Sequence, residues 1–123
     1  MTNEANGERA NDPQDLERLL VARQRSGDIA GMVALFEAGA VVEVGEGRLL
    51  YGHEAIRAFF EEYAASGGKF QVGVQQNAVI AGGLALTSTR LPDGNVTAEV
   101  ARQQPDGTWL WIIDRYTIAQ ERR

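Results

Sequence analysis

The sequence predicts an α+β fold in which three helices of the N-terminal half pack against a curved antiparallel β-sheet. Apolar residues at helical spacing dominate the first half of the chain. From Lys69 onward, each break in the apolar pattern is a hairpin signal: Ala81-Gly82-Gly83, Pro92-Asp93-Gly94 and Pro105-Asp106-Gly107. Helices first and hairpin-linked strands afterwards are typical of an α+β domain.

The composition is that of one globular domain, and it excludes several classes of function. The chain has 123 residues, 44% of them hydrophobic and 24% charged, which suffices for one core without disulfides or metal. The net charge is −5 and no basic run occurs, so we expect no nucleic acid and no membrane surface as a partner. Cysteine is absent, which excludes thiol nucleophiles and iron–sulfur clusters. No membrane span or signal peptide is recognised, and we expect a cytoplasmic protein.

We expect a single domain over residues 12–119, between a disordered N-terminal tail, residues 1–11, and a polar C-terminal tail, residues 120–123. The first helix is expected to begin with Asp12 as its N-cap. Pro13 then takes the first helical position, where a proline is well tolerated.

Two further helices follow. Gly27 ends the first helix, and Asp28 caps a second one that extends to Gly39. Its apolar stripe consists of Ile29, Met32, Val33 and Phe36. A third helix begins at Gly52-His53-Glu54 and is broken by Ser66-Gly67-Gly68. Its apolar face consists of Ile56, Phe59, Phe60 and Tyr63.

The remaining segments are predicted to be strands. Residues 40–44 and 48–51 form a hairpin around the turn Gly45-Glu46-Gly47. The four strands that complete the sheet lie near residues 69–80, 84–91, 95–103 and 108–118.

The last hairpin carries the most informative pattern. Its second strand contains Trp109-Leu110-Trp111-Ile112-Ile113, which predicts cover on both faces of the strand. If Pro105-Asp106 forms the tip, Glu99 and Asp114 lie opposite one another, with Cβ atoms about 4.5–5.5 Å apart. Two carboxyl groups that close under apolar cover cannot both ionise cheaply, so one pKa should rise. The protonated group can then donate a proton or a hydrogen bond, and its partner can accept one.

Other readings of these residues stay open. Glu99 could point to solvent, because a slip of one residue turns a strand side chain to the other face. Asp114 could pair with an arginine, either Arg90 or Arg102. The two tryptophans belong either to the core or to a dimer surface.

The only histidine, His53, lies at a helix start, where it caps the helix, lies on the surface or takes part in catalysis. With one histidine and no cysteine, we expect no metal site and no cofactor.

These features resemble the SnoaL-like, ketosteroid-isomerase-like family of the nuclear transport factor 2-like superfamily. The resemblance extends over roughly residues 12–119 and rests on the order of elements and three motifs. These are the Gly27-Asp28-Ile29 corner, the Gly52-His53-Glu54-Ala55-Ile56-Arg57 helix start and the Gly107-Thr108-Trp109…Ile113-Asp114 strand. It implies a cone-shaped, cystatin-like α+β barrel that encloses a deep apolar pocket. The fold hosts isomerases, cyclases, hydrolases, dehydratases and binding domains, so it does not define the reaction.

The resemblance also assigns positions within the pocket. Steroid isomerases pair an aspartate base with an oxyanion hole made of a tyrosine and a protonated aspartate. By alignment, the base position is Val44, the tyrosine position is Leu20 and the protonated-acid position is Glu99. Polyketide cyclases and limonene epoxide hydrolase both use an acid on the final strand, and Asp114 matches the position of that acid.

The resulting hypothesis is a pocket protein that performs cofactor-free acid–base chemistry on a small apolar substrate carrying a carbonyl or similar group. The reaction would be of an isomerase, cyclase, dehydratase or hydrolase type. The hydrolase also needs an arginine and a second aspartate on an earlier strand, and the nearest positions here are the hydroxyl residues Thr87 and Thr89. Asp114 would be the general acid/base, and Glu99 the neutral hydrogen-bond donor. The expected substrate-binding residues are Tyr116, Ile112, Tyr51, His53, Leu20, Val44, Phe36 and Phe59. The alternative is a non-catalytic ligand-binding or dimerisation domain, and we expect a homodimer.

Overall fold

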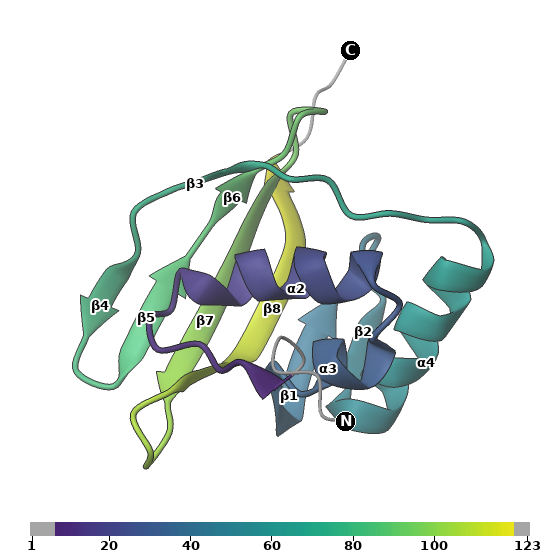
Figure 1. Ribbon diagram of the computed structural model, residues 1–123. Helices are drawn as coiled ribbons and strands as arrows, with labels where there is room; N and C mark the ends of the chain where they lie inside the picture. The colour runs from purple at the N-terminus through teal and green to yellow at the C-terminus, as the bar shows by residue number, and fades with distance from the viewer. Residues whose placement is uncertain (1–6, 120–123) are drawn as a thin grey trace.

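The computed structural model describes residues 7–119, so the predicted C-terminal tail and most of the N-terminal tail lie outside the described residues. Three helices lie wholly within this range: α2 (Asp15–Arg25), α3 (Ile29–Val33) and α4 (Gly52–Ala65). Figure 1 shows them packed on one face of a twisted eight-stranded sheet. The predicted α+β class, with three helices in the N-terminal half, is confirmed.

The strands are β1 (Phe36–Glu43), β2 (Leu49–Tyr51), β3 (Val74–Gln75), β4 (Val79–Ala81), β5 (Leu84–Thr87), β6 (Thr89–Arg90), β7 (Val96–Gln103) and β8 (Trp109–Ala119). The main sheet has the order β2-β1-β8-β7-β5-β4, and β6 pairs with both β7 and β3. The predicted single strand over residues 69–80 is wrong, because only two short strands form within it.

The sheet is mixed, which corrects the prediction of a fully antiparallel one. β1 and β8 run parallel, and the other paired strands run antiparallel. The parallel pair joins the N-terminal hairpin to the C-terminal meander, with α4 between them in the chain. A parallel pair needs such a long crossover connection, since a tight turn can only reverse the chain.

Aspartate side chains bind backbone amides at or just before the starts of the first two helices. The predicted end of the second helix is wrong. Asp28 caps α3 as predicted, because its Oδ1 accepts a 2.9 Å hydrogen bond from the Gly31 amide. The predicted continuation of this helix to Gly39 fails, since Phe36 already pairs with Trp111 at the start of β1. At the first helix, Asp12 accepts a 2.9 Å bond from the Gln14 amide in a turn, and the helix begins two residues later than predicted, at Asp15 in place of Pro13.

The core lies between the helices and the inner face of the sheet. Trp111 and Phe36 are among its largest fully buried side chains, and their ring centroids are 5.3 Å apart. Trp109 is also buried, so neither tryptophan belongs to an exposed dimer surface. The predicted cover on both faces of β8 is wrong for the outer face, where Ile113 is 53% exposed.

The packed part of the chain begins before Asp12, contrary to the predicted tail boundary. Ala10 is buried, and its carbonyl accepts a 2.9 Å hydrogen bond from the amide of Trp109. The buried guanidinium of Arg23 donates to the carbonyl of Glu8 and, at 2.7 Å, to that of Gly31. Among the described residues, no helix is long and apolar enough to cross a membrane.

Candidate functional site

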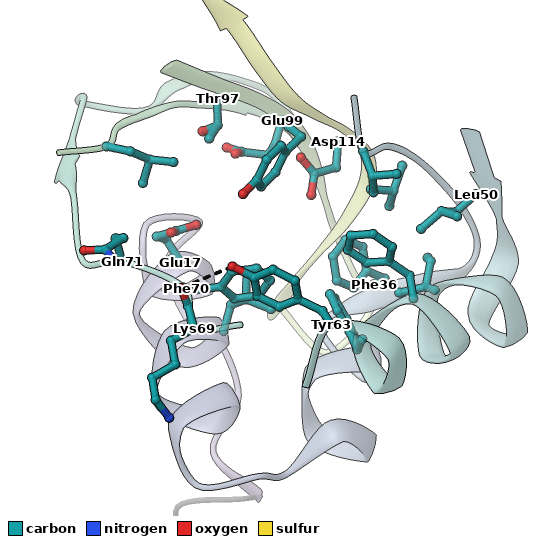
Figure 2. Close-up of a pocket in the computed structure, with 18 of the residues that line it drawn as sticks. Glu17, Phe36, Leu50, Tyr63, Lys69, Phe70, Gln71, Thr97, Glu99 and Asp114 are labelled. Carbon is teal, nitrogen blue, oxygen red and sulfur yellow. Dashed lines mark hydrogen bonds between the residues drawn. The ribbon is translucent and has the colours of Figure 1, made fainter. Parts of the chain in front are cut away.

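A cavity of about 250 Å³ lies between the inner face of the sheet and the helices (Figure 2). Its wall comes from α2, α4, four of the strands and the segment that follows α4. Most of the side chains on this wall are apolar or aromatic, as in typical small-molecule sites.

Strand register decides which polar groups face this cavity. Glu99 on β7 pairs with Asp114 on β8, as the hairpin signals predicted. The same row continues to Thr87 on β5 in one direction and to Val42 and Leu50 on β1 and β2 in the other. Side chains of directly paired residues point to the same face, so the whole row is directed inward.

Glu99 is buried and hydrogen-bonded, with 4% of its surface exposed, so the alternative that it points to solvent is wrong. Its Oε1 accepts a 2.6 Å hydrogen bond from the hydroxyl of Thr87, which in turn accepts a 3.3 Å bond from Nε1 of Trp111. Burial raises the pKa of Glu99, and the hydroxyls of Thr87 and Thr97 oppose this rise. The carboxyl group is therefore held in one orientation and favours its neutral form.

The carboxyl group of Asp114 points into the cavity beside that of Glu99 (Figure 2). The arginine alternatives are wrong, since Arg102 pairs with Glu37 at 2.9 Å and Arg90 is not among the residues of the cavity wall. Burial, together with the nearby charges of Glu99 and Glu17, raises the pKa of Asp114 well above its usual range.

A third acid, Glu17 of α2, faces the same cavity and was missed by the sequence analysis. Burial, with a smaller contribution from the charge of Glu99, raises its pKa to about 7. Its position could have been inferred from Leu20, because residues three apart share one helix face and the resemblance had placed Leu20 in the pocket.

The other predicted substrate-binding residues divide into two groups. Those on the cavity wall are Tyr116, Leu20, Val44, Phe36 and Phe59. Those not on the wall are Ile112, Tyr51 and His53.

Each residue of the second group has a local reason for its position. Tyr51 is 66% exposed, because it follows Leu50 along β2 and adjacent strand residues point to opposite faces. His53 has its Nε2 2.7 Å from the carbonyl oxygen of Phe36, so it ties the first turn of α4 to β1. Ile112 lies where the pairing of β7 with β8 is irregular.

Aromatic rings form the side of the cavity opposite Glu99 and Asp114 (Figure 2). Tyr63 and Phe70 stack with ring centroids 5.1 Å apart, and Phe60 meets Phe70 edge-on at 6.1 Å. Tyr116 is half-buried near the acids, and burial is the main cause that raises the pKa of its phenol. The described residues contain no group of three or more histidine, cysteine or acidic side chains placed to hold a metal ion.

Taken together, these groups can donate and accept protons and hydrogen bonds inside an apolar chamber. The neutral carboxyl groups are potential donors, and any one that ionises becomes a base of increased strength. Perturbed carboxyl groups in a cavity are typical of functional sites.

Comparison with known proteins shows the fold. No protein-family model and no curated protein matches the sequence. A nuclear transport factor 2-like protein with a cystatin-like fold from Novosphingobium aromaticivorans matches with a TM-score of 0.63 and 18% identity, over 82% of this chain and 75% of that one. A candidate ketosteroid isomerase from Parabacteroides distasonis matches with a TM-score of 0.65 and 19% identity, over 82% and 80% of the two chains.

A third match is a candidate calcium/calmodulin-dependent protein kinase type II association domain from Thiobacillus denitrificans. It has a TM-score of 0.72 and 14% identity, over 88% of this chain and 95% of that one. At such identities the likeness defines the fold and leaves the activity open.

Proposed function

We propose that this chain, which has the cystatin-like fold of nuclear transport factor 2-like proteins, performs cofactor-free acid–base chemistry on a small, largely apolar molecule. The observation that carries the proposal is the register pair of Glu99 and Asp114, whose carboxyl groups face an apolar cavity. Such a pair supplies both a proton acceptor and a hydrogen-bond donor to a bound carbonyl group.

The hydrogen bonds around Glu99 support a division of roles. An indole N–H can only donate, so the Thr87 hydroxyl accepts from Trp111 and gives its single proton to Oε1 of Glu99. The acidic proton of neutral Glu99 then resides on Oε2, from which it can be donated to a substrate oxygen. Asp114 has no hydrogen-bond donor among the described residues to stabilise its carboxylate, so once it ionises it is a base of increased strength that can take a proton from the substrate and return it.

The proposal is deliberately broader than steroid isomerisation. Val44 and Leu20 line the cavity at the positions that the family resemblance gives to the base and the tyrosine, and neither can perform acid–base chemistry. The proposed isomerase, cyclase, dehydratase or hydrolase type of reaction therefore depends on the β7–β8 acids.

Exchange of carbon-bound protons for deuterium tests the proposal, because it detects proton abstraction before the full reaction is known. The purified protein is incubated in deuterated buffer with a panel of compact cyclic ketones, and exchange beside the carbonyl is followed by NMR. We expect the wild type to accelerate exchange and Asp114→Asn to lose about 10²–10⁴-fold of the acceleration.

Glu61→Gln is the matched control, because Glu61 is an exposed residue of α4 that does not line the cavity. It should exchange the ketones like the wild type. The proposal is overturned if the wild type accelerates exchange of no ketone, or if Asp114→Asn is as active as the wild type.

We also propose a homodimer, formed through the outer face of the sheet. Apolar side chains line up across six strands on this face: Val79, Leu86, Val100, Ile113, Val41 and Tyr51. A twofold axis would bring this row against its copy, so a single patch would serve both subunits.

A further inference from the structure

We propose that the ligand of the cavity is an organic cation: a compact apolar molecule with one basic nitrogen, whose ammonium group lies among the carboxyl groups of Glu17, Glu99 and Asp114. The inference rests on the proposed function for the location of the site, and it adds the chemical class of the ligand. Three features of the wall carry it: its charges, its unmet hydrogen-bonding groups and its aromatic rings.

The charges on the wall are unbalanced. The acidic residues on it are Glu17, Asp93, Glu99 and Asp114, whereas the single basic residue among the described lining residues is Lys69. Lys69 is exposed, and Figure 2 shows its amine directed away from the cavity. An anionic ligand would oppose ionisation of these acids and find no cationic group pointing toward it from the described part of the wall, whereas a cationic ligand would stabilise their ionised forms. A cation is the ligand whose charge complements this wall.

The acids also have unmet hydrogen-bonding capacity. Oε1 of Glu99 accepts from Thr87, and both oxygens of Asp93 accept from Asn95. By contrast, neither Glu17 nor Asp114 has a hydrogen-bond partner among the described residues, and both face the cavity. Both residues are half-buried, so these oxygens are open to the cavity and can accept hydrogen bonds from a bound molecule or from water. An ammonium group brings up to three donors and no acceptor.

The remaining wall suits the apolar body of such a ligand. The stacked rings of Tyr63 and Phe70, with centroids 5.1 Å apart, stand across the cavity from Glu99 and Asp114 (Figure 2). Their faces carry negative potential, which attracts a cation as well as apolar atoms. The cavity volume of about 250 Å³ limits the ligand to a compact skeleton, such as a single ring with a short side chain.

Binding of a cation is linked to the protonation state of the three carboxyl groups on the cavity wall. Burial raises the pKa of each of the three acids, and a nearby positive charge lowers it again. Binding should therefore release protons, and the affinity should increase as the pH rises through the range in which the free carboxyl groups titrate. The titratable groups that face the ligand position are Glu17 from α2, Tyr63 from α4, Glu99 from β7, Asp114 and Tyr116 from β8, and Lys69 and Asp93 from the loops.

Three probes that share one carbon skeleton test the inference by isothermal titration calorimetry: cyclohexylmethylamine, cyclohexylmethanol and cyclohexanecarboxylate. At about pH 8, where the amine is still protonated, we expect the amine to bind about tenfold or more tightly than the alcohol, and the carboxylate to bind most weakly. Repeating the titration in two buffers of different ionisation enthalpy should reveal proton release for the amine and none for the alcohol.

Variants of the acidic residues test whether these residues cause the preference for the amine over the alcohol. Asp114→Asn should remove most of the preference for the amine and leave binding of the alcohol nearly unchanged. Glu17→Gln is the second variant, in case the first fails to fold, and Glu61→Gln on the exposed side of α4 is the control that should behave as wild type.

Equal or tighter binding of the alcohol overturns this inference and leaves the proposed function standing. The same holds if the amine preference survives in Asp114→Asn and Glu17→Gln. If no probe binds, this inference also falls, and the deuterium-exchange experiment still decides the proposed function on its own.

Discussion

The hydroxyl of Thr87 donates a 2.6 Å hydrogen bond to Oε1 of Glu99, between two strands that bring these residues into direct register. The link places a hydroxyl donor under a buried carboxyl group and connects that group to the indole of Trp111. The orientation of Glu99 in the cavity therefore depends on a residue that does not line the cavity itself.

Removing this donor should change the pKa of Glu99 without changing the shape of the cavity. In Thr87→Val we expect the pKa of Glu99 to rise further, because the lost hydrogen bond had favoured the ionised form. The indole N–H of Trp111 also loses its acceptor, and stability should fall by about 1–3 kcal/mol. Carboxyl-carbon NMR titration and urea denaturation measure the two effects. Thr89→Val is the control, since Thr89 is also buried and its side chain makes no hydrogen bond to an acid among the described residues. An unchanged titration of Glu99 in Thr87→Val would contradict the argument.

The three acids of the cavity should titrate as an interacting group. Glu99→Gln removes a negative charge from the neighbourhood of Asp114 and Glu17, so the pKa of both remaining acids should fall. Carboxyl-carbon NMR over a wide pH range follows both groups separately. If neither titration moves toward its usual range, the acids do not interact through the cavity.

The stability of the protein should depend on pH through Glu17. Its pKa is about 7 in the folded chain and 4.5 ordinarily, so the folded state binds the proton more tightly than the unfolded state. The resulting stabilisation is fully present below about pH 4.5 and is lost as the pH rises through about 7, a change of up to about 3 kcal/mol.

Glu17→Gln should therefore reduce the pH dependence of the melting temperature between about pH 4.5 and 8, and the part that remains belongs to Glu99 and Asp114, whose pKa values burial also raises. Glu61→Gln, on the exposed side of α4, should leave the wild-type slope in place. A slope as steep in Glu17→Gln as in the wild type would show that Glu17 does not contribute to it.

Two side chains hold the cavity wall after α4: the hydroxyl of Tyr63, which donates to the carbonyl of Lys69 at 3.2 Å, and the amide of Gln24. Gln24 of α2 donates to the carbonyl of Gly68 at 2.9 Å and accepts from the amide of Phe70 at 3.1 Å. Gln24→Ala should release this segment, lower stability by about 1–3 kcal/mol and speed hydrogen exchange at the Phe70 amide. Gln76→Ala, at an exposed position, should not affect that amide. Unchanged protection of Phe70 in Gln24→Ala would show that other contacts hold the segment.

The proposed dimer should be sensitive to charge at the centre of the outer row. Ile113→Glu places a carboxylate at a 53% exposed site of that row and should convert the dimer to a monomer in sedimentation velocity. Val72→Glu is the matched control, because Val72 is 62% exposed but lies outside the sheet. A wild type that sediments as a monomer at micromolar concentration would refute the dimer.

Much of the site was predictable because it depends on local signals. The turn at Pro105-Asp106-Gly107 joins β7 to β8, and the side-chain period of two then determines that Glu99 faces Asp114. Asp28 marks its helix start through a bond to a residue three positions later. Such features involve neighbours in the chain, so the sequence contains all the partners that form them.

What the tertiary structure decided involves partners far apart in the chain. Phe36 continues an apolar helical stripe, yet it becomes a strand residue because Trp111 offers it a backbone partner seventy-five positions later. Glu17 joins the two predicted acids only because α2 crosses the sheet there (Figure 1). The sequence alone determined which side chains share a face; the tertiary structure decided which faces meet. The shifts in pKa follow from that meeting, because desolvation is a property of the assembled cavity and of no single segment.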